Sequence, residues 1–215
     1  MPLLTSQGSG TKTKLLDAAL AVIRAKGYSA TTVDDICDTA GVTKGAFFHY
    51  FKSKEDLAVA AADYWGIVTS ALFAQAPYHN LQDPLDRLLA YVDFRKSILQ
   101  GALPEFTCLL GTMVQEVYDT HPTVRDACAR AMSSHAINLE AIIAEAMCKY
   151  GVHGDWTPMS LALYISGTLQ GAFILAKAKN GPQVAADCVD HLRRYIELLF
   201  GSANRKGEPA CQPLQ

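Results

Sequence analysis

The chain has few charged residues and almost no overall charge imbalance. Charged residues make up 19% of its 215 residues, and the formal net charge is −2. The net charge therefore gives no indication of nucleic-acid binding. Because 50% of the residues are hydrophobic, the composition excludes a disordered chain and predicts a globular protein with a sizeable core.

Several motifs are also missing. The six cysteines form no Cys-x-x-Cys pair and no Cys/His cluster at zinc-finger spacing, so we expect no metal and no cofactor. A Gly-rich phosphate loop, Gly-x-Ser-x-Gly and His-Glu-x-x-His are absent, which argues against an enzyme. No apolar run reaches about 18 residues and no signal-peptide core is visible, so we expect a cytoplasmic protein with reduced thiols and no membrane partner.

The charges are unevenly distributed along the chain. Residues 1–54 carry seven Lys/Arg and four Asp/Glu, a net of +3, whereas residues 55–215 carry twelve and seventeen, a net of −5. A basic N-terminal head on an acidic body is consistent with a head that meets phosphate groups.

Two short helical patterns meet at Gly41. Thr32 is a candidate N-cap for the first, and Asp35, three residues later, is a carboxylate version of a capping box. Gly41 stands where the chain must turn sharply, because glycine adopts a positive φ at little cost. Thr43 is the expected N-cap of the second helix.

The second helix has two different faces when it is phased at about 100° per residue. One face carries Ala46, Phe47, Tyr50 and Phe51. The other carries Lys44, Gly45, Phe48, His49 and Lys52. A face with a cation, an aromatic ring, an imidazole and a glycine suits close approach to a DNA groove. Capped helices joined by glycine also occur in bundles that never touch DNA, so the pattern alone leaves both interpretations open.

This stretch resembles the helix-turn-helix signature of the TetR family of bacterial transcriptional regulators. The resemblance covers roughly residues 11 to 60 and includes Thr31-Thr32, Ala40-Gly41-Val42, Lys44-Gly45-Ala46 and Lys52 to Leu57. It implies a ligand-responsive regulator, most often a repressor, which binds a palindromic DNA operator as a homodimer and is released by a small-molecule effector. The expected base contacts are Lys44, Gly45, Phe48 and His49, and the expected phosphate contacts are Thr32, Thr43, Tyr50 and Lys54.

The remaining periodicity predicts an all-α fold of about nine helices, without a β pattern or an internal repeat. We expect a flexible tail over residues 1–10 and a helix-turn-helix domain over residues 11–57. A ligand-binding and dimerisation domain should follow over residues 58–200, with a loose tail over residues 201–215.

Two glycines inside one predicted helix indicate a helix–helix contact. Gly167 and Gly171 are four residues apart and share a face. Because glycine costs about 1 kcal/mol in a helix interior, close approach of another helix should compensate, either within the chain or across a dimer. The family resemblance implies the dimer, in which the last helix contributes Leu192, Tyr195, Ile196 and Leu199.

An effector site is expected among aromatic and polar residues of the body, since such sites have apolar walls and a few polar groups. The candidates are Trp65, Phe94, Cys108, Met113, His135, Asn138 and Gln170. Each of these residue types also occurs in ordinary cores and surfaces.

Cys108 has a second possible role. The stretch from Phe106 to Glu116 is similar to a Cys-Leu-Leu-Gly stretch in the NemR-like branch of the family, in which the cysteine senses electrophiles. Such reactivity needs a lowered thiol pKa. Cys108 is expected in the first turn after Pro104, which favours reactivity, but the neighbouring sequence supplies no Lys or Arg. The alternative is a small buried hydrophobic residue.

Two other classes complete the set of hypotheses. An all-helical enzyme would show turnover, and a helical adaptor would show no salt-dependent DNA binding.

Overall fold

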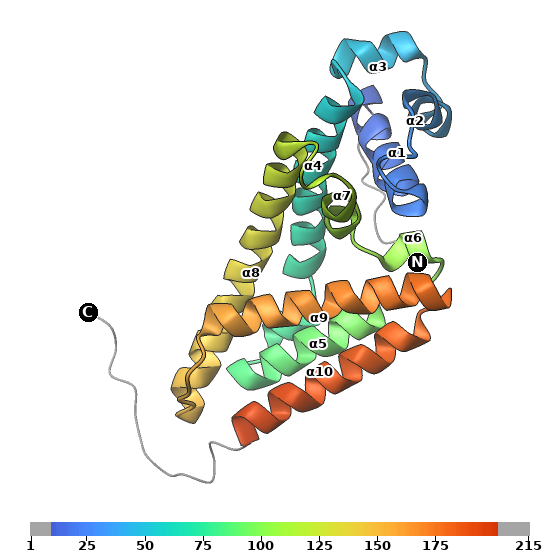
Figure 1. The fold of residues 1–215 in the computed structure, drawn as a ribbon. Coiled ribbons are helices and arrows are strands. Elements are labelled where there is room, and N and C mark those ends of the chain that lie inside the picture. The colour runs from blue at the N-terminus through green and yellow to red at the C-terminus, as the bar shows by residue number, and fades with distance from the viewer. Residues whose placement is uncertain (1–9, 202–215) are drawn as a thin grey trace, which may run out of the picture. The chain divides into compact units, whose positions relative to one another are not determined.

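The computed structural model describes residues 10–201, and all regular structure in that range is helical (Figure 1). The elements are α1 (Thr11–Lys26), α2 (Val33–Ala40), α3 (Lys44–Tyr50), α4 (Lys54–Ala74), η1 (Pro77–Asn80), α5 (Pro84–Ser97), α6 (Leu103–Phe106), α7 (Leu109–Val117), α8 (Pro122–Tyr150), α9 (Pro158–Lys179) and α10 (Gln183–Gly201). The all-α prediction is confirmed. The predicted tails lie outside the described residues, except for Gly10 and Gly201.

The short elements α6 and η1 were not predicted. Pro104 lies in the first turn of α6, where proline is well accommodated because its missing N–H is not needed. In α6 the carboxylate of Glu105 accepts a hydrogen bond from the Ala102 N–H at 2.6 Å. Cys108 consequently lies at the N-cap of α7 and not in the first turn after Pro104.

The chain forms two compact units. The first comprises Met1–Phe73 with Gln100–Ser133, and the second comprises Ala74–Leu99 with Ser134–Gln215. Helix α8 contributes residues to both. The expected division at residue 57 does not separate these units, because Leu57 and Ala61 of α4 and Leu109 of α7 are buried in the same core as α1 to α3.

The first unit is built around the N-terminal helices. Helix α1 packs against α2, α3, α6 and α7, and its apolar residues recur every three or four positions, as an amphipathic helix requires. Phe47 of α3 is fully buried in this core. The buried face of α3 thereby fixes which of its residues point outward.

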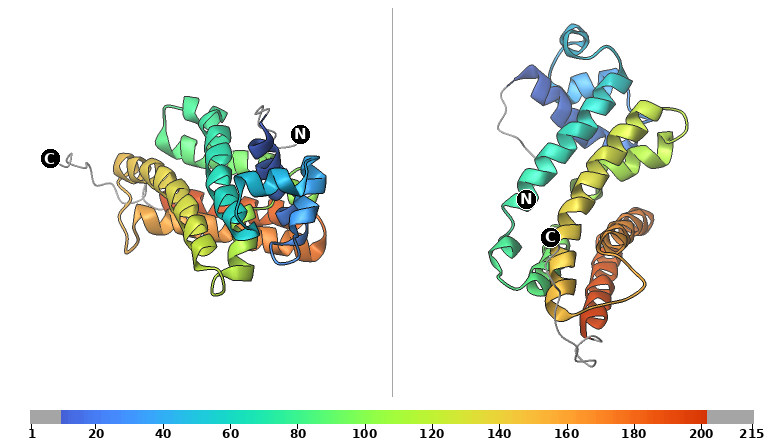
Figure 2. Two further views of the ribbon diagram at one scale, coloured as in Figure 1. Left: turned by 90° about the horizontal axis from the view of Figure 1, so that it is seen from above. Right: turned by 90° about the vertical axis from the view of Figure 1, so that its left-hand side faces the viewer.

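The second unit is built around α5, α9 and α10. Helix α10 packs against α9 and α5, and the red and orange helices lie side by side in both views of Figure 2. Ala185, Val189, Leu192, Ile196 and Phe200 of α10 are buried. Their spacing of three or four residues places them on one face. The opposite face of the helix is left to solvent within this chain.

Candidate nucleic-acid interface

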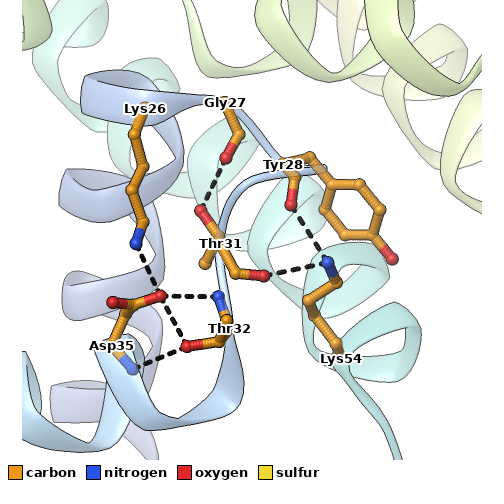
Figure 3. Close-up of polar contacts among 7 residues, drawn as sticks. All are labelled: Lys26, Gly27, Tyr28, Thr31, Thr32, Asp35 and Lys54. Carbon is orange, nitrogen blue, oxygen red and sulfur yellow. Dashed lines mark hydrogen bonds and ion pairs between the residues drawn. The ribbon is translucent and has the colours of Figure 1, made fainter.

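The start of α2 is held by a capping box and an ion pair (Figure 3). Thr32 Oγ1 accepts from the Asp35 N–H at 3.1 Å, and Asp35 Oδ2 accepts from the Thr32 N–H at 2.7 Å. Lys26 Nζ lies 2.6 Å from the same carboxylate oxygen. Hydrogen bonds from Lys26 and Thr32 hold the pKa of Asp35 well below its usual range. The predicted capping box is therefore present.

The turn between α2 and α3 depends on Gly41. Its φ of 64° and ψ of 40° lie in the left-handed region, where a Cβ is unfavourable. The N–H of Val42 donates to the carbonyl of Cys37 at 3.0 Å, which closes the end of α2. Thr43 Oγ1 then accepts from the Ala46 N–H at 3.2 Å and starts α3. Both features were predicted from the sequence.

Helix α3 presents a mixed aromatic and polar face outward. Phe47 and Phe51 are buried, whereas Phe48 is 55% exposed and His49 is also exposed. Tyr50 falls on the same side of the helix as Phe47 by phasing, but its side chain is 40% exposed. The C-terminal end of α3 faces solvent because the chain leaves the helix at Phe51, which takes the core position.

Gly45 is not required by the packing of the chain. A Cβ at this position would meet only Thr43 Oγ1, at an ordinary 3.7 Å. The protein interior therefore has no need of a glycine here. A residue without a side chain beside exposed Phe48 and His49 allows another molecule to approach the backbone of α3 closely.

Both lysines among the expected DNA contacts already have partners in the protein. Lys44 forms an ion pair with Asp34 at 2.7 Å, and both side chains are about 60% exposed. An ion pair as exposed as this is weak, typically below about 1 kcal/mol, so a phosphate or a base can replace Asp34. The pairing with Asp34 raises the pKa of Lys44, which keeps its ammonium charged.

Lys54 has a structural role that the sequence did not predict (Figure 3). Its Nζ donates to the carbonyl of Thr31 at 2.9 Å and to that of Tyr28 at 3.1 Å, and it lies 4.4 Å from the centroid of the Tyr28 ring. Burial lowers the pKa of Lys54, against the opposing effect of Glu116. Lys54 thus ties the first turn of α4 to the α1–α2 loop. A phosphate could accept a hydrogen bond only from the N–H of the Lys54 ammonium that the two carbonyl groups leave unused.

The α1–α2 loop is also held by α7, a connection that sequence analysis missed. The N–H of Ser29 donates to Glu116 Oε2 at 2.8 Å, and the Tyr28 ring meets His121 edge-on at 5.4 Å between centroids. Gly27 has a φ of 87° and faces the same carboxylate. Glu116 is 87 residues from Ser29, so no local sequence signal marks the pair.

The expected effector residues are divided between the two compact units. Trp65, Cys108 and Met113 belong to the first unit, whereas Phe94, His135, Asn138 and Gln170 belong to the second.

Within the first unit, Met113 is fully buried in the core, where it has no surface for a ligand. The Arg24 guanidinium stacks on the Trp65 ring at 5.0 Å and interacts electrostatically with Cys108. Burial lowers the pKa of Arg24 to about 10, against the opposing effects of Cys108 and Glu105. The fold thus brings to Cys108 a cation that the neighbouring sequence lacks.

Within the second unit, His135 meets Tyr91, with 2.8 Å between Nε2 and the phenol oxygen. Asn138, one turn further along α8, is exposed. Burial lowers the pKa of His135 to about 4, and the charge of Arg95 adds to this effect. His135 is therefore a neutral hydrogen-bonding group at neutral pH.

The expected dimer residues separate into two groups. Within the described residues 10–201, a Cβ at Gly167 or Gly171 would meet no atom of another element within 4 Å, so neither glycine accommodates a neighbouring helix there. Tyr195 is exposed beside Tyr164, with 5.0 Å between ring centroids. Leu199 is half-buried.

Leu192 and Ile196 were wrongly assigned to the surface between two chains. Both are buried in the core of the second unit, with 2% and 0% of their surfaces exposed. Leu192 and Ile196 are four residues apart and share the buried face of α10 with Val189 and Phe200, so they face the core of their own chain. The exposed apolar residues of α9 and α10 are instead Leu163, Tyr164, Ile174, Leu175, Tyr195 and Leu198.

By length and composition alone, α4 and α9 are apolar enough to span a bilayer. Core helices of folded proteins meet the same criterion. Leu57 and Ala61 of α4, and Leu161 and Ile165 of α9, are buried in the cores described above.

Comparison with known proteins accounts for most of the chain. Residues 15–61 match the model described as bacterial regulatory proteins, tetR family. Residues 84–192 match the model described as tetracyclin repressor-like, C-terminal domain. The transcriptional regulator AcuR of Cereibacter sphaeroides is 27% identical over 168 residues, which are 78% of this chain and 77% of AcuR.

Two further comparisons concern a short segment and the fold. The transcriptional repressor KstR2 of Rhodococcus jostii is 47% identical over 53 residues, or 25% of this chain and 26% of that protein. The reduced form of NemR from E. coli superposes with a TM-score of 0.71 at 22% identity, over 86% of this chain and 96% of NemR. This identity shows the shared fold alone, so the NemR-like branch stays a prediction.

Proposed function

This chain belongs to the TetR family of bacterial regulatory proteins, and we propose that it is a homodimeric repressor, released from a palindromic operator by a small-molecule effector. Proteins of this family are transcriptional regulators with a DNA-binding helix-turn-helix domain and a ligand-binding C-terminal domain. Such a regulator acts where the DNA is, in the cytoplasm. KstR2, which is similar to this chain over 53 residues, is itself a repressor.

The outward face of α3 carries this proposal. Gly45, Phe48 and His49 lie exposed on one short helix whose ends are fixed by Thr43 and Phe51. Gly45 permits close approach, Phe48 can pack on a thymine methyl group, and His49 can hydrogen-bond a base edge. Lys44, Thr32, Thr43 and Tyr50 are exposed around this face, where they can meet a base edge or phosphates.

A second copy of the chain is the proposed occupant of the exposed face of α9 and α10. Gly167 and Gly171 leave room on α9, and Leu163, Tyr164 and Leu198 expose apolar surface around them. Monomeric proteins rarely leave so much apolar surface uncovered. A two-fold axis there would set two α3 helices against half-sites about one helical turn, 34–36 Å, apart or a multiple of that.

The first test is selection of tight binders from random duplex DNA, followed by fluorescence anisotropy across a salt series. We expect an enriched palindrome and a steep loss of affinity with salt. His49→Ala should change the preferred base at one position. Equal loss of affinity for the operator and for random DNA in that variant would contradict a reading role for His49.

The dimer has a matched pair of test variants. Gly167→Leu adds a side chain where this chain leaves space, and Gly181→Leu does the same just beyond the end of α9. Light scattering should find Gly167→Leu monomeric and Gly181→Leu dimeric. If Gly167→Leu stays dimeric, α9 is not the interface.

Cys108 supports a second proposed function, a thiol-based electrophile sensor. The observation that favours it is that the fold places the Arg24 guanidinium within electrostatic range of Cys108, a half-buried free cysteine. Burial raises the pKa of nearby Cys128 to about 12, so Cys128 stays a protonated thiol.

The test is treatment with N-ethylmaleimide, with operator affinity as the readout. Because Cys148 is exposed, the reaction is performed on a Cys148→Ser protein, and Cys148→Ser with Cys108→Ser is its control. Alkylation should weaken operator binding in the first protein and not in the control. Unchanged affinity in the first protein would remove the sensor role.

A further inference from the structure

An ion pair between α2 and α3 lies on the surface that the proposed function assigns to DNA. Lys44 is the first residue of α3, and Asp34 lies in the first turn of α2. Lys44 Nζ and Asp34 Oδ1 are 2.7 Å apart, and the two side chains are 60% and 59% exposed. Lys44 is followed directly by Gly45, where another molecule can approach the backbone. A bound DNA would therefore meet both members of the pair.

The position of the Lys44 ammonium is determined by Asp34. The N-terminus of a helix carries a partial positive charge, which disfavours a cation in the first turn. The carboxylate of Asp34 supplies the opposite charge, and its hydrogen bond with Lys44 is the largest cause of the raised pKa of Lys44. The ammonium is thus held toward α2 by a residue of α2 and not by its own helix.

The neighbouring carboxylates of α2 differ from Asp34 in this respect. Asp35 is engaged by its capping box with Thr32 and by Lys26, 2.6 Å away. Asp38 is exposed and lies four residues after Asp34, hence on the same side of α2. Its charge acts on Lys44, but within residues 10–201 the hydrogen bond and the ion pair of Lys44 are with Asp34. Asp34 and Asp38 therefore carry the same charge on one helix face, with and without contact to Lys44.

An ammonium held in this way can still contact a base. It has three N–H donors, of which Asp34 accepts one, and two are left for O6 and N7 of a guanine in the major groove. A base edge carries no net charge, so the carboxylate of Asp34 does not repel it. A phosphate group is an anion, so Asp34 repels it and competes with it for Lys44.

We propose that Asp34 is a positioning residue for sequence recognition, which holds Lys44 toward a guanine of the operator and keeps it from the phosphates of other DNA. This inference rests on the proposed function, because it requires α3 to enter the major groove. Lys44 makes the base contact, and Asp34 acts through Lys44. Asp34 therefore lowers the affinity for random DNA more than the affinity for the operator.

The experiment compares Asp34→Asn with Asp38→Asn in the full-length protein. Fluorescence anisotropy measures the affinities for the selected operator and for random duplex DNA of the same length, across a salt series. Asp34→Asn should lower the ratio of these affinities about tenfold, the usual scale for one base contact. Asp38→Asn should change the ratio by less than about twofold, because salt screens a surface charge that makes no contact.

Two results would overturn the proposal at this stage. One is an equal ratio in the wild type and in Asp34→Asn. The other is an equal fall in both variants, which would show a general effect of charge. Asp34→Ala repeats the test if Asp34→Asn does not fold by circular dichroism, since alanine is well accommodated in a helix.

The salt dependence provides a second readout. Without Asp34, Lys44 should bind one more phosphate of random DNA, so the slope of log affinity against log salt should steepen by about 0.9 in Asp34→Asn. An unchanged slope would contradict the competition between Asp34 and phosphate that the proposal requires.

A variant of Lys44 shows whether Asp34 acts through it. In a Lys44→Ala protein, Asp34→Asn should leave the ratio of affinities unchanged, because the residue that Asp34 positions is missing. A fall as large as in the wild-type background would mean that Asp34 contacts DNA itself or acts through the stability of α2, and the proposal would fail. Asp34→Glu keeps the carboxylate and should retain most of the ratio, whereas a loss as large as in Asp34→Asn would also count against positioning by charge.

The wild-type protein separates this inference from the proposed function. If selection from random DNA enriches no palindrome, the repressor proposal fails, and the role of Asp34 fails with it. If the wild type selects a palindrome and Asp34→Asn discriminates as strictly, the role of Asp34 alone is refuted.

Discussion

Gly27→Ala tests how the α1–α2 loop is held against α7. In the wild type Gly27 has a φ of 87° and a ψ of 162°, a region that residues with a Cβ rarely occupy. That strain costs about 1–3 kcal/mol. The new Cβ would also lie 3.0 Å from the carboxylate carbon of Glu116 and closer still to its Oε1.

The carboxylate can swing away, since it is the far end of a flexible side chain. It then loses its 2.8 Å hydrogen bond from the Ser29 N–H. Because this bond is exposed, its loss costs about 1 kcal/mol. Together the two effects predict that Gly27→Ala lowers the free energy of unfolding by about 2–4 kcal/mol.

Gly41→Ala is the matched control. Gly41 also has a positive φ, of 64°, but a Cβ there would meet nothing within 4 Å. The left-handed conformation alone predicts a loss of about 1–2 kcal/mol. Urea unfolding at one fixed protein concentration measures both variants, since dimerisation makes stability depend on concentration.

A double-mutant cycle isolates the contact with Glu116. Glu116→Ala alone should cost about 1 kcal/mol. In the Gly27→Ala background it should cost almost nothing, because the bond to Ser29 is already lost. The reasoning is refuted if Gly27→Ala costs no more than Gly41→Ala, or if Glu116→Ala costs as much in both backgrounds.

Three more predictions concern the head and the second unit. Lys54→Ala should lower the free energy of unfolding by about 1–2 kcal/mol through loss of its two carbonyl bonds, whereas exposed Lys52→Ala should change it by less than about 0.5 kcal/mol; equal urea midpoints would contradict this. Gly45→Ala should stabilise the fold by up to about 1 kcal/mol yet weaken operator binding about tenfold; unchanged anisotropy titrations would exclude close approach there. Because the pKa of His135 in the folded chain is about 4, below about 6.5 when unfolded, the unfolded chain binds more protons between these values, and stability should fall as the pH drops through them. His135→Gln should reduce this fall, and an identical fall in its urea midpoints from pH 7 to pH 5 would contradict that assignment.

Local features of this protein were determined by the sequence alone. The capping box of Thr32 and Asp35, the left-handed turn at Gly41 and the N-cap at Thr43 all lie within four residues of the groups they serve. Helical periodicity acts over the same distance, which is why it also predicted the exposure of Phe48. The nine helices expected from the sequence correspond to the helices of the described residues, except for α6 and η1, which are each about one turn long.

Contacts across long stretches of chain were decided by the tertiary structure. Ser29 meets Glu116 across 87 residues, and Tyr91 meets His135 across 44. Lys54 was predicted to contact a phosphate. In the structure it donates hydrogen bonds to two carbonyl groups that lie more than twenty residues earlier in the chain. Leu192 is equally apolar whether it faces its own core or a second chain. Helical periodicity groups residues on one face, but only packing against α5 and α9 determines what that face meets.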